Sequence, residues 1–436
     1  MGGTDAMQAA GELRLPRFEV EQIEDYAARL HSSWLFNGFK KTVKDMTGRV
    51  FEKPVEIADA PQQVIEWAEN IDMQGRDLSA FAKEVFQDGF ASGVSFIMAD
   101  APRRDAEATR EQANTLGLRP YLVHLRVEDV LGWKTETYGN VLAFSQFRIM
   151  ESYEYDDPRD EFMQVTGEQV RVLDSDESGV SVRIYRKDEG KNWVLFEQYP
   201  TDAQEITVVP YYAQRTGFAT GEPVLEDLAD VNLAHWRSQS DQTNVLHYAR
   251  VPIVHVAGLE DGEVFKISAN TAFVTRNHEA KVSWINFDDK AIKVGRQDLK
   301  DLEYQMQVMG LQLLVDGQRS ATGSVLDAKK ETSGLGMMAD NLKDALEHAL
   351  AWVADYGGLG EQSIGLVVNK DFGAVPLTAQ EVTAMQKDVA LGLLSREEYY
   401  EERKRRGVLR SDLDTEADIE LVDNAEPDLG GGDGDE

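Results

Sequence analysis

The seven histidines are the first candidates for catalytic or metal-binding chemistry. They are His31, His124, His235, His247, His255, His278 and His348. No two of them have the spacing of a metal-binding helix such as His-Glu-x-x-His, so we interpret them as structural residues. The chain has no cysteine, which excludes thiolate metal ligands, cysteine nucleophiles and disulfides together.

Motifs for phosphate binding and for hydrolysis are also missing. There is no Gly-x-x-x-x-Gly-Lys-Ser/Thr loop and no Gly-x-Ser-x-Gly elbow, so neither an ATP-driven motor nor a common serine hydrolase is indicated. Gly334-Leu-Gly336 has two glycines but no third and no preceding strand. It does not predict a dinucleotide site.

Charged clusters are the remaining candidates. Asp288-Asp289 predicts a turn, and the acidic spacing over Asp412–Asp418 lacks the central glycine and the closing glutamate of a calcium loop. The basic cluster Arg403–Arg406 fits an exposed helix end, with contact to an acidic partner or to nucleic acid as the alternative. We therefore predict no enzyme activity, no cofactor and no metal site.

The net charge of −33 is the most unusual property of the composition. Residues 411–436 hold 11 acidic and no basic side chains, and removing those 11 charges leaves −22 on the rest of the chain. Tight, sequence-independent DNA binding uses Lys and Arg to replace counterions, so this is no DNA clamp. The acidity serves solubility, or it forms a surface that DNA passes without adhering.

The length and the apolar content predict a folded chain of several structural units. At 436 residues and 42% hydrophobic content it can bury a large core. No run of about 18 apolar residues predicts a membrane span, and the first residues lack the apolar segment of a secretory signal. We expect a flexible start over residues 1–17 and a disordered acidic tail.

The other elements of the chain are arranged around the stretch from Glu222 to Tyr356. A helix is expected over Glu222–Arg250, and it contains eight residues, Arg237–Asn244, without an apolar side chain. Such a helix bridges solvent, lies between subunits, or is not stable. A second helix over Gln297–Leu314 carries a 3-4-3-4 apolar seam. Its members are Leu299, Leu302, Met306, Met309 and Leu313. Strand-like runs lie between the two helices: Val251–Ala257, Val264–Ser268, Ala272–Thr275 and Lys281–Phe287.

The chain before this stretch reads as helices followed by an antiparallel β region. Helices are expected over Phe18–His31, Trp34–Thr47, Pro61–Asn70 and from an Asp77 cap to Ala91, and Gly48 is expected to end the second. Val94–Met98 is expected to be a buried strand. Period-two patterns predict strands over Tyr121–Leu125, Val141–Met150, Glu168–Leu173, Val180–Arg186, Trp193–Glu197 and Ile206–Val209.

The chain after it reads as a polar loop and more helices. Val315–Thr322 is the loop, and Ser324–Tyr356 is a long helix with a break expected at Gly334 and Gly336. Gly357-Gly358 is its stop. A short strand over Ile364–Asn369 and two short helices within Pro376–Gly407 follow.

The order of these elements, together with local motifs, resembles the portal proteins of tailed bacteriophages, in particular an uncharacterised portal-like family found beside terminase genes. The motifs that carry the resemblance are Trp34–Val43, Gly48–Phe51, Leu225–Leu233, Ser240–His247, Leu302–Met306, Asp371-Phe-Gly373, Gly392–Tyr399 and Lys404–Leu409. None is a catalytic signature, so the resemblance depends on their order over residues 18–420.

The resemblance implies an α+β, portal-like fold. Its parts would be a wing (18–221), a first stem helix (222–250), a clip (251–292), a second stem helix (293–314), a tunnel loop (315–322), a long wing helix and return strand (323–375) and a helical crown (376–410), before the tail (411–436). The seam residues would pack the stem helices. Side chains lining the tunnel would be Arg237, Gln239, Asp241 and Asn244, and the DNA-facing loop would present Asp316, Gln318, Arg319 and Ser320.

The resemblance also implies an assembly and a location. The subunits would form a homo-oligomeric ring, typically of twelve, at one capsid vertex of the virion, assembled in the bacterial cytoplasm. The partners would be the large terminase subunit, the major capsid and scaffold proteins, a head–tail adaptor and double-stranded DNA without sequence specificity, and no membrane. Two alternatives stay open: another self-assembling virion scaffold or adaptor, and an acidic hydrolase with a carboxylate pair.

Overall fold

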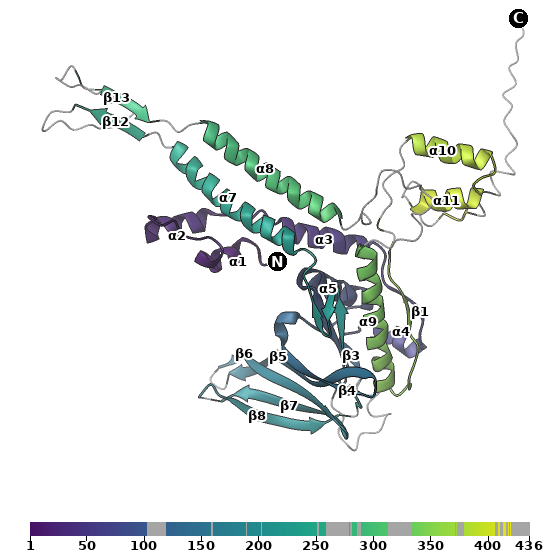
Figure 1. Ribbon diagram of the computed structural model, residues 1–436. Coiled ribbons are helices and arrows are strands. Elements are labelled where there is room, and N and C mark those ends of the chain that lie inside the picture. The colour runs from purple at the N-terminus through teal and green to yellow at the C-terminus, as the bar shows by residue number, and fades with distance from the viewer. Residues whose placement is uncertain are drawn as a thin grey trace, which may run out of the picture. The chain divides into compact units, whose positions relative to one another are not determined.

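The structure is a computed structural model, shown in Figure 1. It describes residues 1–102, 119–157, 160–188, 190–201, 203–250, 253–258, 281–285, 289–312, 334–370 and 379–405, together with 279, 372, 409, 413–415, 417 and 419. In these parts of the chain, no helix is both long and apolar enough to cross a membrane. The chain divides into two compact units, which we call the hairpin unit (1–45 and 223–334) and the sheet unit (46–222 and 335–436).

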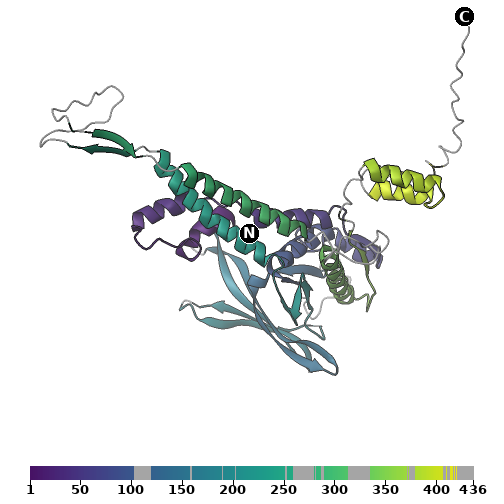
Figure 2. The same ribbon diagram turned by 45° about the horizontal axis from the view of Figure 1, so that its top comes forward.

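The hairpin unit is built on two long antiparallel helices. Its elements are α1 (Gly3–Ala9), a 3₁₀ turn (Gly11–Leu13), α2 (Ile23–Ser32), the start of α3 (Gly38–Val50), α7 (Glu226–Arg250), β12 (Ile253–Ala257), β13 (Lys281–Ile285) and α8 (Asp289–Gln312). Figures 1 and 2 show α7 and α8 side by side, with the β12–β13 pair beyond their ends. The pair is antiparallel, with Ile253 opposite Ile285 and Ala257 opposite Lys281.

Several expectations for this unit need correction. The segment 1–17 was expected to be flexible, but it contains α1 and a 3₁₀ turn, and Leu15 is buried. Residues 18–45, which the resemblance would place in the wing, lie in the hairpin unit. Helix α8 begins at Asp289, eight residues before the expected start at Gln297. An aspartate at a helix N-terminus is favoured by the helix dipole, which explains why Asp289 begins a helix where the sequence suggested a turn.

The sheet unit contains the main β structure. Its strands are β1 (Glu56–Asp59), β2 (Val94–Asp100), β3 (Tyr121–Leu125), β4 (Val130–Tyr138), β5 (Val141–Asp157), β6 (Asp160–Asp176), β7 (Gly179–Lys187), β8 (Trp193–Pro200), β9 (Val208–Tyr212), β10 (Arg215–Gly217), β11 (Thr220–Gly221) and β14 (Gly365–Val367). Its helical elements are the end of α3, α4 (Gln62–Ala68), α5 (Leu78–Ser92), a 3₁₀ turn (Val127–Asp129), α9 (Gly334–Tyr356), α10 (Ala379–Ala390) and α11 (Arg396–Arg405).

Two antiparallel sheets share one core in the sheet unit. Strands β4 to β8 form a five-stranded meander in chain order, and β2 pairs with β3 and β9 in a three-stranded sheet. Phe96 of β2 packs against Phe147 of β5 with ring centroids 5.5 Å apart, and Trp133 stacks on Phe147. The predicted antiparallel region is therefore confirmed, although β5 and β6 are longer than expected and β9 belongs to the smaller sheet.

The predicted helices α5 and α9 are largely confirmed, but the break expected at Gly336 is wrong, since α9 is continuous from Gly334 to Tyr356. Asp77 caps α5, because its carboxylate accepts a hydrogen bond of 2.7 Å from the Ala80 amide. In α9 the predicted apolar stripe is buried from Leu335 to Val353, and the helix ends at Tyr356, immediately before the two glycines. Residues 324–333 of the expected helix lie outside the described residues, and the helix is described from Gly334 onward.

Candidate functional site

The two long helices hold each other in a defined register. Gln242 of α7 donates a hydrogen bond of 3.1 Å to the Ile292 carbonyl of α8, and Ser238 donates one of 2.8 Å to Asp298. Further along the helix pair, Nε2 of His235 lies 3.4 Å from Oε1 of Glu303. Because the helices are antiparallel, residues 229–233 of α7 are level with about 304–309 of α8 at the usual rise per residue.

The predicted apolar seam of α8 is partly buried within this unit. Leu299 and Met306 are buried, and Leu302 and Met309 are half-buried. Leu313 lies outside the described residues. A Cβ added to Gly38 would come within 2.7 Å of the Met306 sulfur, so α3 approaches α8 closely at this glycine. The seam therefore packs α8 against the start of α3 as well as near α7.

The polar stretch of α7 is partly used inside the subunit. The expectation that Arg237–Asn244 faces a neighbouring subunit on one side and a water-filled channel on the other concerns an assembled ring and stays a prediction. Within one subunit, Ser240 and Gln242 are buried. Their polar groups are satisfied by partners on α8 and on the N-terminal segment, as buried polar groups require. The stretch is polar, in part, because it forms hydrogen bonds inside one subunit.

The four predicted tunnel-lining residues do not form one cluster. Arg237 is exposed and donates a hydrogen bond of 3.1 Å to the Arg14 carbonyl. Gln239 is half-buried and bonds Thr243 at 3.2 Å, and Asn244 is also half-buried. The side chain of Asp241 is 53% exposed and lies 3.9 Å from Arg29. Arg237 and Asp241 are thus the members that present charge at the surface of this unit.

A buried ionic cluster around Arg29 joins the N-terminal segment to α7. The guanidinium of Arg29 donates two hydrogen bonds of 2.7 Å to Glu21 and one of 3.0 Å to the Pro16 carbonyl. The Arg29 and Glu21 side chains are only 3% and 8% exposed. Its third nitrogen lies 3.4 Å from the Ser240 hydroxyl. Such a pair is retained only when its hydrogen bonds are satisfied, and here nearly every donor has a partner.

This cluster shifts the pKa values of its acidic members in opposite directions. Hydrogen bonds from Arg29 lower the pKa of the Glu21 carboxyl, so this group stays ionised. Burial raises the pKa of Asp241, against the opposing effect of Arg29. Glu21 is therefore the principal counter-ion of Arg29.

His235 is a buried histidine between α7, α8 and the N-terminal segment. It is fully buried, and its ring centroid lies 5.3 Å from that of Phe36. Burial lowers the pKa of His235, and the neighbouring Glu303 opposes the shift. The structural interpretation of the scattered histidines holds at this position. Among the described residues, no group of three histidine or acidic side chains could hold a metal ion.

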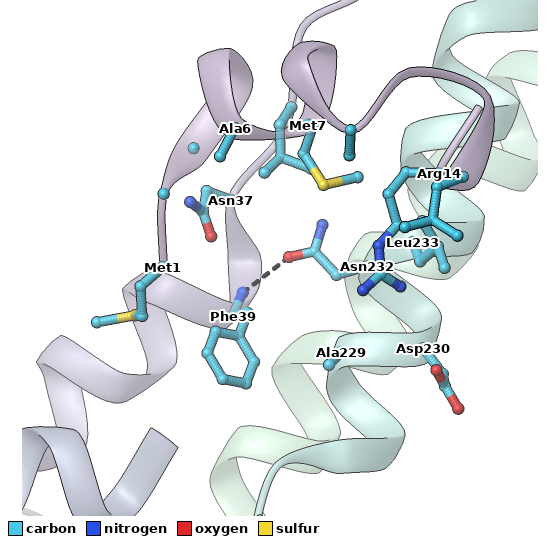
Figure 3. A pocket seen from close by; sticks show the side chains of 15 residues that line it. Met1, Ala6, Met7, Arg14, Asn37, Phe39, Ala229, Asp230, Asn232 and Leu233 are labelled. Atoms are coloured by element: carbon cyan, nitrogen blue, oxygen red, sulfur yellow. Dashed lines mark hydrogen bonds between the residues drawn. The ribbon is translucent and has the colours of Figure 1, made fainter. Parts of the chain in front are cut away.

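A pocket of about 510 Å³ lies between the N-terminal segment and α7 (Figure 3). Its apolar walls are side chains of the N-terminal helix, of residues 35–39 and of α7. The main apolar contributors are Met1, Met7, Leu13, Leu35, Phe39 and Leu233. Arg14, Asn37, Asp230 and Asn232 add polar groups. Asn232 links α7 to the N-terminal segment at this pocket. Its side-chain oxygen accepts a hydrogen bond of 2.9 Å from the backbone N–H of Phe39, and its side-chain nitrogen donates one of 2.7 Å to the Phe36 carbonyl.

The predicted tunnel loop cannot be placed. Asp316, Gln318, Arg319 and Ser320 lie outside the described residues, as do the predicted strands Val264–Ser268 and Ala272–Thr275. The described part of the candidate site is thus the α7–α8 pair, the β12–β13 pair and the N-terminal segment packed on α7.

Residues 224–357 match the model of a family described as a domain of unknown function, DUF4055. The match begins two residues before α7 and ends one residue after α9. No curated protein matches the sequence.

Solved structures with similar chains come from particles of a gene transfer agent (GTA). A chain in the neck of an empty GTA particle, described with C6 symmetry, is 13% identical with a TM-score of 0.44 and covers 93% of this chain and 98% of that one. A chain in the neck of the native particle, described with C12 symmetry, is 13% identical with a TM-score of 0.41 and covers 93% of this chain and 98% of that one. A chain of the native virion is 12% identical with a TM-score of 0.39 over 92% and 98%.

Proposed function

We propose that this chain is the subunit of a portal ring, a non-enzymatic conduit for double-stranded DNA at one vertex of a phage capsid. The observation that carries the proposal is the α7–β12–β13–α8 excursion. Two antiparallel helices of 25 and 24 residues carry an antiparallel strand pair beyond their ends. This excursion is formed by the segments that the portal resemblance assigns to the stem and the clip.

The length of the helices suits a tunnel wall. At about 1.5 Å per residue, each helix is roughly 36 Å long. The hydrogen bonds at Gln242 and Ser238 fix one helix against the other, and the cluster at Arg29 fixes α7 to the N-terminal segment. A wall built from such pairs resists the lateral force of a moving DNA molecule better than a single helix does.

The charge of the chain suits a passage that does not hold DNA. Each subunit has a net charge of −33, and a ring of about twelve multiplies it. DNA that meets mainly acidic side chains displaces few counterions and therefore binds weakly at any salt concentration. Arg237 is one exposed cation on α7, with Asp241 four residues away.

We further propose that Gln318 and Arg319 make brief contacts with DNA at the narrowest point of the tunnel. The loop 315–322 contains one arginine among neutral and acidic residues. Particles carrying both Gln318→Ala and Arg319→Ala are expected to package DNA but to lose part of it on storage. Retention at the wild-type level, measured as DNA per purified particle, would remove this role from the loop.

The partners of this proposal are those implied by the portal resemblance. They are the large terminase subunit and the head–tail adaptor at the clip, and the capsid and scaffold proteins around the ring. The same resemblance gives the location, a capsid vertex of the virion.

Native mass spectrometry of the purified chain tests the assembly. The expected result is one dominant species of about twelve copies of the 48.8 kDa chain, since closed rings are the outcome of head-to-tail contacts that complete a rotation. A stable monomer or dimer at every concentration, including in the presence of the scaffold protein, would instead favour the acidic hydrolase. A closed assembly without an axial opening would favour another virion scaffold or adaptor.

A further inference from the structure

Helix α8 exposes an apolar stripe that has no cover within the hairpin unit. Tyr304 is 67% exposed and Leu311 is 55% exposed, with the half-buried Val308 between them. These three residues are at positions i, i+4 and i+7, so they share one face of the helix. We call them the α8 stripe. Large apolar side chains gathered on one face mark an interaction surface.

The pocket of the same unit is the surface that complements this stripe. It is mostly apolar, and it lies at residues 229–233 of α7. The register of the two helices places this part of α7 level with about residues 304–309 of α8. The stripe and the pocket are therefore at the same height along the helix pair.

The stripe lies on the face of α8 that points away from the pocket. Met306 packs against Gly38, beside the pocket residues 35–39, and Tyr304 and Val308 are each two positions from Met306, which is about 160° around the helix. Figures 1 and 2 show α1 and α2 along the side of α7 away from α8. One copy therefore cannot insert its own stripe into its own pocket. A second copy rotated about an axis parallel to the helices brings its stripe to the pocket at the same height, which is the geometry of a head-to-tail ring contact.

One pair of charged residues beside the two surfaces is also complementary, while the exposed Asp230 is a further charge at the pocket. The exposed Arg14 lines the pocket, and its carbonyl accepts the hydrogen bond from Arg237. Arg237 is level with about residue 301 of α8, where Asp301 is exposed one turn before Tyr304. In the ring contact, Asp301 of one copy thus faces Arg14 of the next.

We infer that Tyr304, Val308 and Leu311 of one copy fill the pocket at Met7 and Leu233 of the next copy. The inference rests on the proposed ring and names the surfaces that hold its subunits together. The N-terminal segment then has a function, because it forms one wall of the pocket.

Disulfide crosslinking tests the contact, because the chain has no cysteine of its own. The full chain carrying Tyr304→Cys and Met7→Cys is assembled, oxidised and separated without reductant. Each copy then has one thiol on each surface, so we expect a ladder of covalent oligomers up to the ring number. Each single variant should give at most covalent dimers.

Val294→Cys paired with Met7→Cys is the matched control. Val294 lies on the same helix and is 69% exposed, but it is about 15 Å along the axis from Tyr304. Since a disulfide requires Cα atoms within about 7 Å, the control should crosslink at least about tenfold less. A second measurement uses Tyr304→Asp, which should abolish rings, and Tyr304→Phe, which should keep them.

The outcomes separate this contact from the ring itself. Two results would overturn the contact and leave the portal proposal standing. Either the rings of the Tyr304→Cys, Met7→Cys variant form no covalent oligomers, or the Val294→Cys, Met7→Cys control forms as many. The pocket would then take another occupant. A ladder from an assembly without a channel would support the contact and overturn the conduit. A chain that never assembles would overturn both.

Discussion

The hydroxyls of Ser33 and Ser240 are hydrogen-bonded at 2.9 Å, although they are 207 positions apart in the sequence. Both side chains are buried. Ser240 lies in the polar stretch of α7, and Ser33 follows the last residue of α2. This contact helps to explain the polar stretch of α7, because the N-terminal segment supplies polar partners for Arg237, Ser240 and Asp241.

Arg29→Met is expected to destabilise the hairpin unit. It leaves the Glu21 carboxylate buried without its counter-ion, which costs about 3 kcal/mol in the free energy of unfolding. Urea unfolding measures the loss, and hydrogen exchange in α2 localises it. Arg126→Met is the control, since Arg126 and Glu128 are exposed and 3.4 Å apart, and it should change stability by less than about 0.5 kcal/mol.

The loss of unfolding free energy caused by Arg29→Met should become smaller at acidic pH. Arg29 lowers the pKa of Glu21 in the folded chain, so this pair contributes stability above the ordinary pKa of a glutamate, about 4.3. The contribution is lost as the pH falls through the lowered pKa. An Arg29→Met effect of constant size from pH 7 to pH 3 would mean that the pair does not contribute through its charge.

His235 predicts a loss of stability on mild acidification. Burial lowers its pKa in the folded chain, so below about pH 6.5 the unfolded chain takes up a proton that the folded chain does not. Stability therefore falls as the pH drops below 6.5 and levels off below the lowered pKa. His235→Gln should flatten this part of the stability curve, and an unchanged curve in this variant would contradict the assignment.

Two glycines in helices predict opposite effects of the same substitution. A Cβ at Gly89 of α5 would lie 2.6 Å from ring atoms of the buried Tyr211, so Gly89→Ala should cost about 1–3 kcal/mol through overpacking. Gly48 of α3 has nothing within 4 Å of an added Cβ, so Gly48→Ala should stabilise by about 0.5–1 kcal/mol. Thermal or urea unfolding measures both, and equal signs would contradict the packing at Gly89.

Local patterns predicted much of the sheet unit. Asp77 was recognised as a cap, Tyr121–Leu125 is a strand with the predicted bounds, and the buried stripe of α9 follows the helical period. These features depend on residues close together in the sequence. Gly48 was expected to end a helix, but α3 continues to Val50. One exposed glycine costs only about 1 kcal/mol in a helix, and the buried Met46, Thr47 and Val50 continue the packed face.

The candidate site was less predictable. The sequence does not predict the contacts of Ser33 and Asn232, or the contact of Arg29 with Ser240, because these partners lie about 200 residues away and a single sequence does not record such pairs. The polar stretch of α7 is evident in the sequence, but the partners of Ser240 and Gln242 within the subunit are not. An arginine on the short helix α2, with a glutamate eight residues before it, was the available signal for a buried ion pair.

Cryo-electron microscopy of the purified, assembled chain tests the portal proposal most directly. We expect a closed ring of about twelve copies around an axial channel at least about 20 Å wide, which is wide enough for duplex DNA. The α7–α8 pairs should stand side by side along the channel, with β12 and β13 at one end. A dimer with a solid centre, or a ring in which α7 and α8 lie away from the channel, would contradict the account.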